Sequence, residues 1–282
     1  MSSGGCGAAV TADGANVFFT FIVPVLIFIL IAGALGFALA YLGEKIKVER
    51  DPKIDDVSRF LAGVNCGGCG CAGCDAFAEA LVSGKAKLSQ CNPTSAENKD
   101  NIAKILGQSG GASKRLVAVV HCNGGNKCRD KHAYQGFGDC QSAELLAGGN
   151  KACRVGCMGL GSCNEYCKYG AVSVDKDTGV AVVDGAKCTA CGMCVSICPK
   201  KIISRIPFDA KVYVACSNTW RGKDVRSVCE NGCIACGLCE KKCPAEAIRL
   251  SNNLAIIDYD KCTACGACVS VCPSKCIHNY AG

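Results

Sequence analysis

The chain has 282 residues, of which 28 are cysteine, and its formal net charge is +7. This length allows about two to four small domains. A cysteine content this high indicates either a disulfide scaffold or a metalloprotein. The positive charge is not gathered into a run of Lys and Arg, so the composition gives no argument for nucleic-acid binding.

An uncharged segment lies near the N-terminus. Residues 14–43 contain no charged side chain, and residues 17–42 are almost continuously apolar. A helix of this length spans a bilayer. A cleavable signal peptide would be shorter and would follow basic residues, whereas here Lys45, Lys47 and Arg50 come after the segment. The positive-inside rule therefore predicts a single-pass anchor in the cell membrane, with the rest of the chain on the cytoplasmic side.

A glycine-rich, cysteine-containing module follows a charged connector, 51–60. Its spacing is C-x2-C-x4-C-x16-C, formed by Cys66, Cys69, Cys74 and Cys91. Glycine lets the backbone wrap a metal cluster, so the spacing predicts an iron–sulfur site, with zinc as the rival. A short helix is expected over 75–81, and Cys71 is interpreted as a small buried residue. Residues 107–114 are expected to form a flexible linker.

Three later runs share the spacing C-x2-C-x2-C-x3-C-P. They are Cys188, Cys191, Cys194 and Cys198; Cys233, Cys236, Cys239 and Cys243; and Cys262, Cys265, Cys268 and Cys272. In bacterial ferredoxins, three cysteines of such a run hold one [4Fe–4S] cluster and the fourth reaches a neighbouring cluster. Zinc sites instead use paired C-x2-C units separated by a longer arm, so the spacing favours iron–sulfur.

The middle of the chain repeats the plan of its last third. Residues 117–122 match 212–216 in character, and a further run is formed by Cys153, Cys157, Cys163 and Cys167. In this alignment Leu160 occupies the place of Cys236, so the first run lacks a ligand. Cys153 is expected to replace it because it is nearest in sequence. Cys128 and Cys140 are the alternatives.

Spacing also predicts how the runs pair. Cys157 of the first run lies 31 residues before Cys188, and Cys233 lies 29 before Cys262, whereas Cys188 and Cys233 are separated by 45. The first run is therefore expected to pair with the second, and the third with the fourth. Each pair would form a two-cluster domain with crossed fourth ligands. Cys198 would complete the cluster of the first run and Cys167 that of the second, while Cys272 and Cys243 would cross in the other pair.

The fold class expected from these features is α+β. It comprises a single N-terminal transmembrane helix, a small 4Fe-4S module and two tandem ferredoxin-like dicluster domains, with bounds 1–50, 51–112, 113–208 and 209–282. Hairpins are predicted at 171–183 and 247–257, where short alternating segments flank turn residues.

At least five [4Fe–4S] clusters are expected. A sixth is left open because eight cysteines have no site: Cys6, Cys71, Cys122, Cys128, Cys140, Cys216, Cys229 and Cys276.

This order of parts resembles the B subunit of the Rnf complex over nearly the whole chain. The segments CNGGNKC (122–128) and CMGLGSC (157–163) resemble the longer form found in anaerobes. The resemblance implies a membrane ferredoxin:NAD+ oxidoreductase that couples electron flow to Na+ or H+ translocation. In it, this subunit would accept electrons from soluble ferredoxin and relay them to the other membrane subunits. Leu160 departs from the expected ligand pattern and leaves the first ligand set open.

The residues themselves favour electron relay. The chain has no Walker loop and no dinucleotide-binding fingerprint after a strand, so hydride transfer is assigned to other subunits. Its three histidines, His121, His132 and His278, are interpreted as surface or structural residues and not as ligands. Three rival functions are a polyferredoxin subunit of a membrane hydrogenase or of a formate/CO dehydrogenase complex, a zinc-loaded structural module, and a redox-sensing protein.

Several lysines flank the cysteine runs and are candidates for docking a ferredoxin. Soluble ferredoxins are generally acidic, and encounter between opposite charges is steered electrostatically. The alternative is that these lysines are ordinary solvated side chains. The candidates are Lys200, Lys201, Lys241, Lys242 and Lys261.

Overall fold

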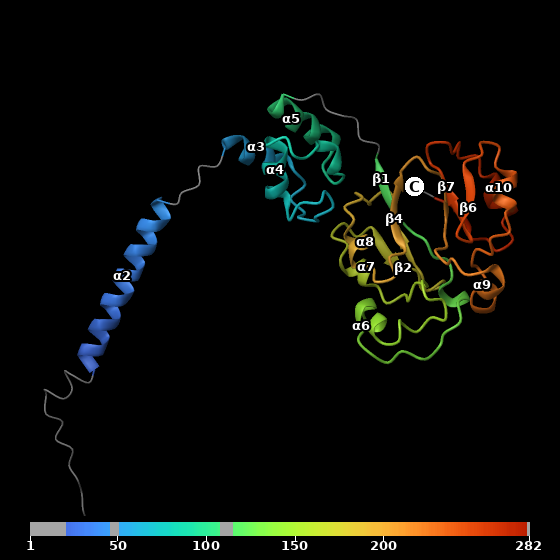
Figure 1. Cartoon of the computed structure of the whole chain (residues 1–282), viewed down its shortest axis with the longest axis horizontal. Coiled ribbons are helices and arrows are strands. Elements are labelled where there is room, and N and C mark those ends of the chain that lie inside the picture. Colours follow the sequence, from blue (N-terminus) through green and yellow to red (C-terminus); the bar gives the residue numbers. More distant parts are fainter. Residues whose placement is uncertain (1–20, 46–50, 108–114, 281–282) are drawn as a thin grey trace, which may run out of the picture. The chain divides into compact units, whose positions relative to one another are not determined.

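The computed structural model describes residues 21–45, 51–107 and 115–280. The chain divides into two compact units, Met1–Asp51 and Pro52–Gly282, each with its own internal contacts. Figure 1 shows the helices and strands of both.

The described part of the first unit is one helix, α2 (Val23–Lys45). Within its residues Val23–Gly43, an 18-residue stretch has a mean hydropathy of 2.6 and is not buried by other parts of the protein. Pro24 lies in the first turn, where proline costs no helical hydrogen bond. By length and composition this is the one helix in the described residues that can cross a membrane. The beginning of the predicted segment, 14–20, lies outside the described residues.

The second unit begins with a small helical module. Its elements are α3 (Pro52–Phe60), α4 (Cys74–Val82), η2 (Leu88–Gln90) and α5 (Ala96–Leu106). The core is made by Val57, Phe77, Leu81 and Ile102, which are all almost completely buried. The helix predicted at 75–81 is confirmed as α4. The linker predicted at 107–114 lies, apart from Gly107, outside the described residues.

The prediction that 51–60 is a mere connector is wrong. These residues form α3, with Pro52 at its first position and Val57 completely buried. Ile54, Val57 and Leu61 recur three and four residues apart, which places them on one face of a helix. Because the segment is rich in charged residues, its composition did not indicate this short apolar stripe.

The remainder of the unit consists of two halves with the same plan. The first half contains η3 (Gly125–Lys127), α6 (Cys140–Leu145), α7 (Ser162–Glu165) and α8 (Met193–Ile197), with β1 (Leu116–Val120) paired to β4 (Ile203–Pro207) and β2 (Val172–Val174) paired to β3 (Ala181–Val183). The second half contains α9 (Gly222–Val228), α10 (Leu238–Lys242) and α11 (Ala267–Val271), with β5 (Val212–Val214) paired to β8 (Ile277–Asn279) and β6 (Ile248–Ser251) paired to β7 (Leu254–Ile257). All four pairings are antiparallel.

Both predicted hairpins are confirmed. In the second, Ser251 pairs with Leu254, so only Asn252 and Asn253 form the loop, with φ angles of 49° and 60°. Two successive residues with positive φ are typical of the type I′ turn, whose twist matches that of the strands. Asparagine is among the residues that adopt this backbone conformation at low cost.

The same local turn opens the helix of every cysteine run. Each helix follows a glycine with φ between 75° and 85°, a conformation that glycine adopts without strain. These glycines are Gly161, Gly192, Gly237 and Gly266. The third cysteine of each run lies in the first turn of the helix that follows. The first run therefore keeps the backbone of the others although Leu160 replaces a cysteine.

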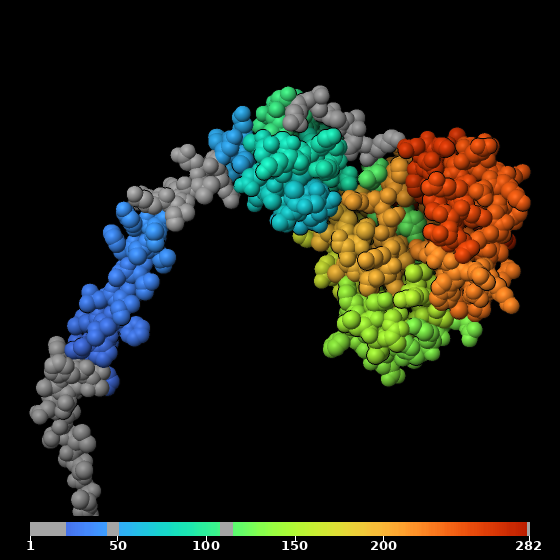
Figure 2. All heavy atoms as spheres, in the orientation of Figure 1, coloured from blue at the N-terminus to red at the C-terminus, as the bar shows by residue number. Residues whose placement is uncertain are grey.

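The two halves pack against each other. Val117, Val119, Ile206 and Ala210 form a buried cluster to which Tyr213, Tyr259 and Tyr280 of the second half contribute. Figure 2 shows the first half, green to gold, in contact with the second, orange to red. His121 joins them as well: its Nδ1 lies 2.7 Å from the Val214 carbonyl oxygen and its Nε2 lies 2.6 Å from Ser204 Oγ. Burial lowers the pKa of His121, which agrees with a structural role.

Candidate iron–sulfur sites

Five pockets in the described part of the second unit are each lined by at least four cysteines. Their empty volumes, counted with the space open to solvent, are alike at about 310–410 Å³. Among the described residues, no three His, Cys, Asp or Glu side chains converge on a point where a single metal ion would sit. A cube instead binds each thiolate to a different iron, so its ligands stand around a volume.

The helical module brings its four expected cysteines together. Cys66, Cys69, Cys74 and Cys91 line one pocket, at the start of α4 and the end of η2. Asn65 fixes this loop, because its Oδ1 accepts a hydrogen bond of 2.7 Å from the Cys74 amide. The Cys91 thiol lies 3.1 Å from Thr94 Oγ1. Cys71, interpreted as a small buried residue, does not line the pocket and is only partly buried against the core of the module.

The second run lies with a cysteine of the first. Cys188, Cys191 and Cys194 share a pocket with Cys167 and not with Cys198, which is the crossed arrangement expected from the spacing. The Ala118 amide donates to Cys188 Sγ and the Ala171 amide to Cys167 Sγ, at 3.4 and 3.3 Å. Burial raises the pKa of Cys194 to about 12. The thiol therefore holds its proton until a metal displaces it.

The first run lies with Cys198 and with a cysteine from α6. The four cysteines that line this pocket are Cys140, Cys157, Cys163 and Cys198. Cys140 begins α6, and its amide donates a hydrogen bond of 2.8 Å to Ser162 Oγ at the start of α7. Gln141 also contacts Ser162, through its Oε1 at 3.1 Å. These bonds place the thiol of Cys140 where Leu160 leaves the run without a cysteine.

Cys153, expected to be the fourth ligand of the first run, does not line this pocket. It lines another pocket, and its Sγ accepts a hydrogen bond of 3.2 Å from Asn218 of the second half. Cys140, one of the two named alternatives, lines the pocket of the first run, whereas Cys153 and the other alternative, Cys128, line a different one. The expectation was based on nearness in sequence. The three residues between Cys153 and Cys157, however, are enough to carry the chain from one pocket to the next.

Lys200, expected to be an exposed docking lysine, is also placed differently. Its side chain is only 3% exposed, and its Nζ lies 2.6 Å from Glu144 Oε2 in an ion pair. It donates two further hydrogen bonds, of 2.7 and 2.8 Å, to the Gly148 and Arg154 carbonyl oxygens. Lys200 therefore fixes the segment between α6 and the first run. Lys201 is exposed, as expected.

The second half repeats the crossed arrangement. Cys233, Cys236 and Cys239 share a pocket with Cys272. Cys243 and Cys262 pack against the buried cluster that contains Cys268. The amide of Ala247 donates to Cys243 Sγ at 3.4 Å, as the Ala171 amide does in the first half.

A further thiol, which the spacing did not single out, lies in the pocket that Cys272 lines with the third run. Cys276 Sγ is 3.6 Å from Cys272 Sγ, and Cys276 is almost completely buried. Hydrogen bonding with Cys276 lowers the pKa of Cys233 to about 6 and that of Cys272 to about 5. Its position four residues after Cys272 is the only sequence signal that could have indicated it.

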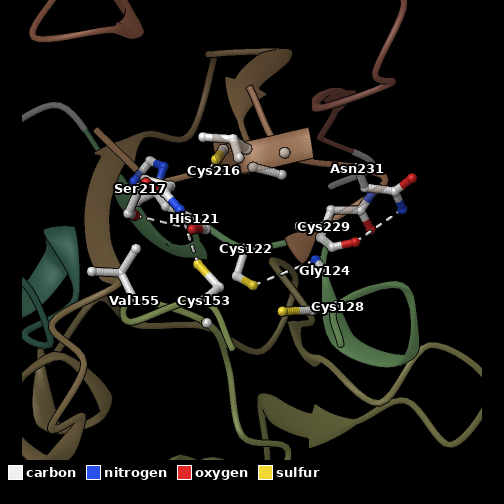
Figure 3. A pocket seen from close by; sticks show the side chains of 16 residues that line it. His121, Cys122, Gly124, Cys128, Cys153, Val155, Cys216, Ser217, Cys229 and Asn231 are labelled. Atoms are coloured by element: carbon white, nitrogen blue, oxygen red, sulfur yellow. Dashed lines mark hydrogen bonds between the residues drawn. The ribbon is translucent and has the colours of Figure 1, made fainter. Parts of the chain in front are cut away.

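The fifth pocket lies between the halves, and Figure 3 shows its cysteines. Hydrogen bonds from the thiols of Cys153 and Cys229 lower the pKa of Cys128 to about 3. The spacing rules miss this group because its members come from both halves. The complete set of lining cysteines is Cys122, Cys128, Cys153, Cys216 and Cys229.

These donor sets fit [4Fe–4S] clusters. Thiolates are the ligands that hold such clusters, and backbone N–H groups directed at sulfur stabilise their negative charge. Models of three families match the chain: a putative Fe-S cluster model at residues 61–93, a 4Fe-4S binding domain at 181–204 and a 4Fe-4S dicluster domain at 232–277.

Three similar proteins cover most of the chain. It is 42% identical over 80% of its length to the B subunit of the Na(+)-translocating ferredoxin:NAD(+) oxidoreductase complex of Acetobacterium woodii, covering 68% of that protein. It is 44% identical over 81% of its length to the B subunit of the ion-translocating oxidoreductase complex of Methanosarcina acetivorans, covering 86% of it. It is 39% identical over 84% of its length to the B subunit of the proton-translocating ferredoxin:NAD(+) oxidoreductase complex of Clostridium ljungdahlii, covering 84% of it. The chain therefore belongs to the family of the B subunits of ion-translocating oxidoreductase complexes, the Rnf complexes.

Proposed function

We propose that this chain is the iron–sulfur electron-transfer subunit of an ion-translocating ferredoxin:NAD+ oxidoreductase complex. It accepts electrons from reduced ferredoxin and passes them to the other membrane subunits. The observation that carries this proposal is the series of thiol-lined pockets in one chain that belongs to the B-subunit family. Cysteine is the residue type that carries this chemistry, and hydride transfer and ion translocation belong to other subunits.

Four of the proposed ligand sets follow the pocket linings: Cys66, Cys69, Cys74 and Cys91; Cys140, Cys157, Cys163 and Cys198; Cys167, Cys188, Cys191 and Cys194; and Cys233, Cys236, Cys239 and Cys272. The fifth set, Cys243, Cys262, Cys265 and Cys268, follows the crossed spacing of the last two runs. The dicluster domains then occupy 113–208 and 209–282, as the spacing predicts. Because each run supplies ligands to two clusters, neighbouring clusters are held close together, which is what stepwise electron transfer requires.

The anchor is α2. Its apolar span is long enough for a bilayer, and Lys47 and Arg50 follow it in the sequence. The positive-inside rule then places everything after α2 in the cytoplasm. This orientation gives soluble ferredoxin access to the clusters and keeps them beside the membrane subunits of the complex.

The proposal is tested with the full-length chain, purified anaerobically in detergent. Mixing it with reduced ferredoxin should bleach its absorption at about 400 nm as the clusters are reduced. The same chain stripped of iron is the control and should leave the ferredoxin reduced. Full iron content without any bleaching would exclude ferredoxin as the donor. It would favour a polyferredoxin subunit that takes its electrons from another enzyme of its complex.

We expect ferredoxin to dock beside α10. Lys241 and Lys242 are exposed there, and Cys236 and Cys265 are the two exposed ligand thiols among the described residues, so their clusters lie near the surface. Replacing both lysines by glutamate should slow ferredoxin oxidation about tenfold or more at low salt, because steering by opposite charges is lost. The measurement is the bimolecular rate of bleaching in a stopped-flow instrument.

A matched control separates docking from a general change of charge. Lys85→Glu with Lys104→Glu makes the same charge change at exposed positions of the helical module, and it should leave the rate nearly unchanged. The effect at Lys241 and Lys242 should fade at high ionic strength, where charges are screened beyond about 10 Å or less. Equal rates for both double variants at low salt would exclude this docking site.

A further inference from the structure

A pocket at the junction of the two halves is lined by five cysteines, none of which belongs to a ligand set proposed above. Its empty volume, about 330 Å³, equals that of the pocket in the helical module and that of the pocket of Cys233, Cys236 and Cys239. Figure 3 shows its thiols around one space, contributed by segments of both halves. A site of this size and composition suits the same kind of cluster.

Three of the thiols form one buried group. Cys128, Cys153 and Cys229 pack together, between 4% and 8% exposed. Cys128 and Cys229 are partners in an isolated antiparallel β-bridge, which fixes the two halves at this point. The Arg129 amide donates to the Val228 carbonyl oxygen at 2.9 Å beside them. The backbone pairing of the two halves therefore holds these thiols close together.

Cys122 is the fourth member. A Cβ atom placed on Gly124 would lie 3.2 Å from Cys229 Sγ, 3.7 Å from Cys122 Sγ and 3.1 Å from Cys128 Cβ. The sulfur atoms of Cys122 and Cys229 therefore flank the same point. Any side chain on Gly124 would enter the space between them, which explains a glycine here.

Cys216 is the fifth lining cysteine but fits the set less well. It is the counterpart of Cys122 in the repeat, and its Sγ accepts a hydrogen bond of 3.3 Å from the Cys233 amide. It packs into the core of the second half, as Cys122 packs against the core of the first, but only Cys122 has its sulfur among the three atoms nearest to a Cβ on Gly124, beside Cys229 Sγ. Cys216 is therefore a neighbour of the site, and it supplies a control for it.

The walls of the pocket suit an anionic cluster. The Gly124 amide donates to Cys122 Sγ at 3.4 Å, and Asn218 Nδ2 donates to Cys153 Sγ at 3.2 Å. N–H donors directed at sulfur stabilise negative charge.

We propose that Cys122, Cys128, Cys153 and Cys229 bind a further [4Fe–4S] cluster at the junction of the two halves. Cys153 and Cys229 each stand four residues before the first ligand of a run, Cys157 and Cys233. The Cys157 amide also donates to Cys122 Sγ at 3.3 Å. The site therefore lies between the two diclusters. Its role rests on the proposed function: the further cluster connects the two diclusters for electron transfer. Such clusters would pass one electron at a time: the cluster that gives up the electron would be oxidised and the next would be reduced by it, so no further reactant is needed.

Iron and acid-labile sulfide counts on the anaerobically purified full-length chain test this site. Six clusters give about 24 iron atoms and as many sulfides per chain. Cys229→Ala and Cys153→Ala should each lower both counts by about four, and the double variant should lose no more than either single one, because both thiols hold the same cluster. Cys216→Ala, in the same pocket, should retain about 24.

The wild-type count decides the question even if a variant fails to fold. About 20 iron atoms in the wild type, or about one zinc per chain in place of four irons, would overturn the proposal. So would a Cys216→Ala variant that loses a cluster while Cys229→Ala does not. Failure of the proposed function looks different: the chain would contain all its iron but would not be reduced by ferredoxin.

Discussion

Removing iron should unfold both cysteine-rich halves of the second unit while leaving α2 and much of the helical module folded. The strands of these halves have three to five residues, and the helices of the cysteine runs four or five. Neither isolated two-stranded pairs nor helices this short are stable in water. Ligation must therefore supply much of the folding free energy. At small metal sites it supplies on the order of 10 kcal/mol, comparable with the whole stability of a small domain.

The composition of the core strengthens this expectation. In the second half, five of the eleven buried core residues are cysteines: Cys216, Cys233, Cys239, Cys268 and Cys276. Without iron these side chains are small hydrophobes with little area to bury. The helical module instead buries large side chains such as Phe77, Leu81 and Ile102.

Amide hydrogen exchange before and after anaerobic chelation measures the effect region by region. Protection in β1, β4, β5 and β8 should fall to that of an unfolded chain, whereas α4 and α5 should keep part of theirs. Iron and sulfide added back should restore the protection. Chelation should also proceed faster at acidic pH, because the thiols take up protons when iron leaves. Strands that stay protected without iron would show that the apolar core is sufficient.

The sequence was most informative where function depends on local spacing. A C-x2-C-x2-C run specifies its own backbone, because each run includes a glycine with positive φ before a short helix, such as Gly192 or Gly237. The hairpins were equally local, since the positive φ angles of Asn252 and Asn253 set the type of turn. Crossed fourth ligands could be predicted because the number of residues between two runs limits which runs can pair in one two-cluster domain.

The features that the sequence did not reveal depend on distant contacts. Cys140 reaches the first run through hydrogen bonds between α6 and α7, which lie 22 residues apart in the sequence at Cys140 and Ser162. The burial of Lys200 depends on Glu144 of α6. The pocket between the halves joins Cys128 to Cys229, which only the packing of one half on the other brings together. The spacing of cysteines along the sequence gives no information about contacts between residues this far apart.

The crossed ligands provide the second large expected effect. Cys198 should belong to the cluster of Cys157 and Cys163 with Cys140, and Cys167 to that of the second run. Cys198→Ala should therefore remove about four iron atoms per chain from the first cluster. Combining it with Cys163→Ala should remove no more, because both thiols hold one cluster. Combining it with Cys194→Ala should remove about eight, because two clusters lose a ligand.

Cys140 and Cys153 can be assigned by the same logic. Cys140→Ala should add no loss to Cys163→Ala, since their thiols line one pocket, whereas Cys153→Ala should add the loss of a second cluster. Iron counts together with the EPR signals of the reduced chain provide the measurement. If Cys198→Ala with Cys194→Ala cost only about four iron atoms, the two thiols would share a cluster and the crossing would be wrong. Each cysteine run would then hold its own cluster. The proposal that shared runs keep paired clusters close together would lose its structural basis.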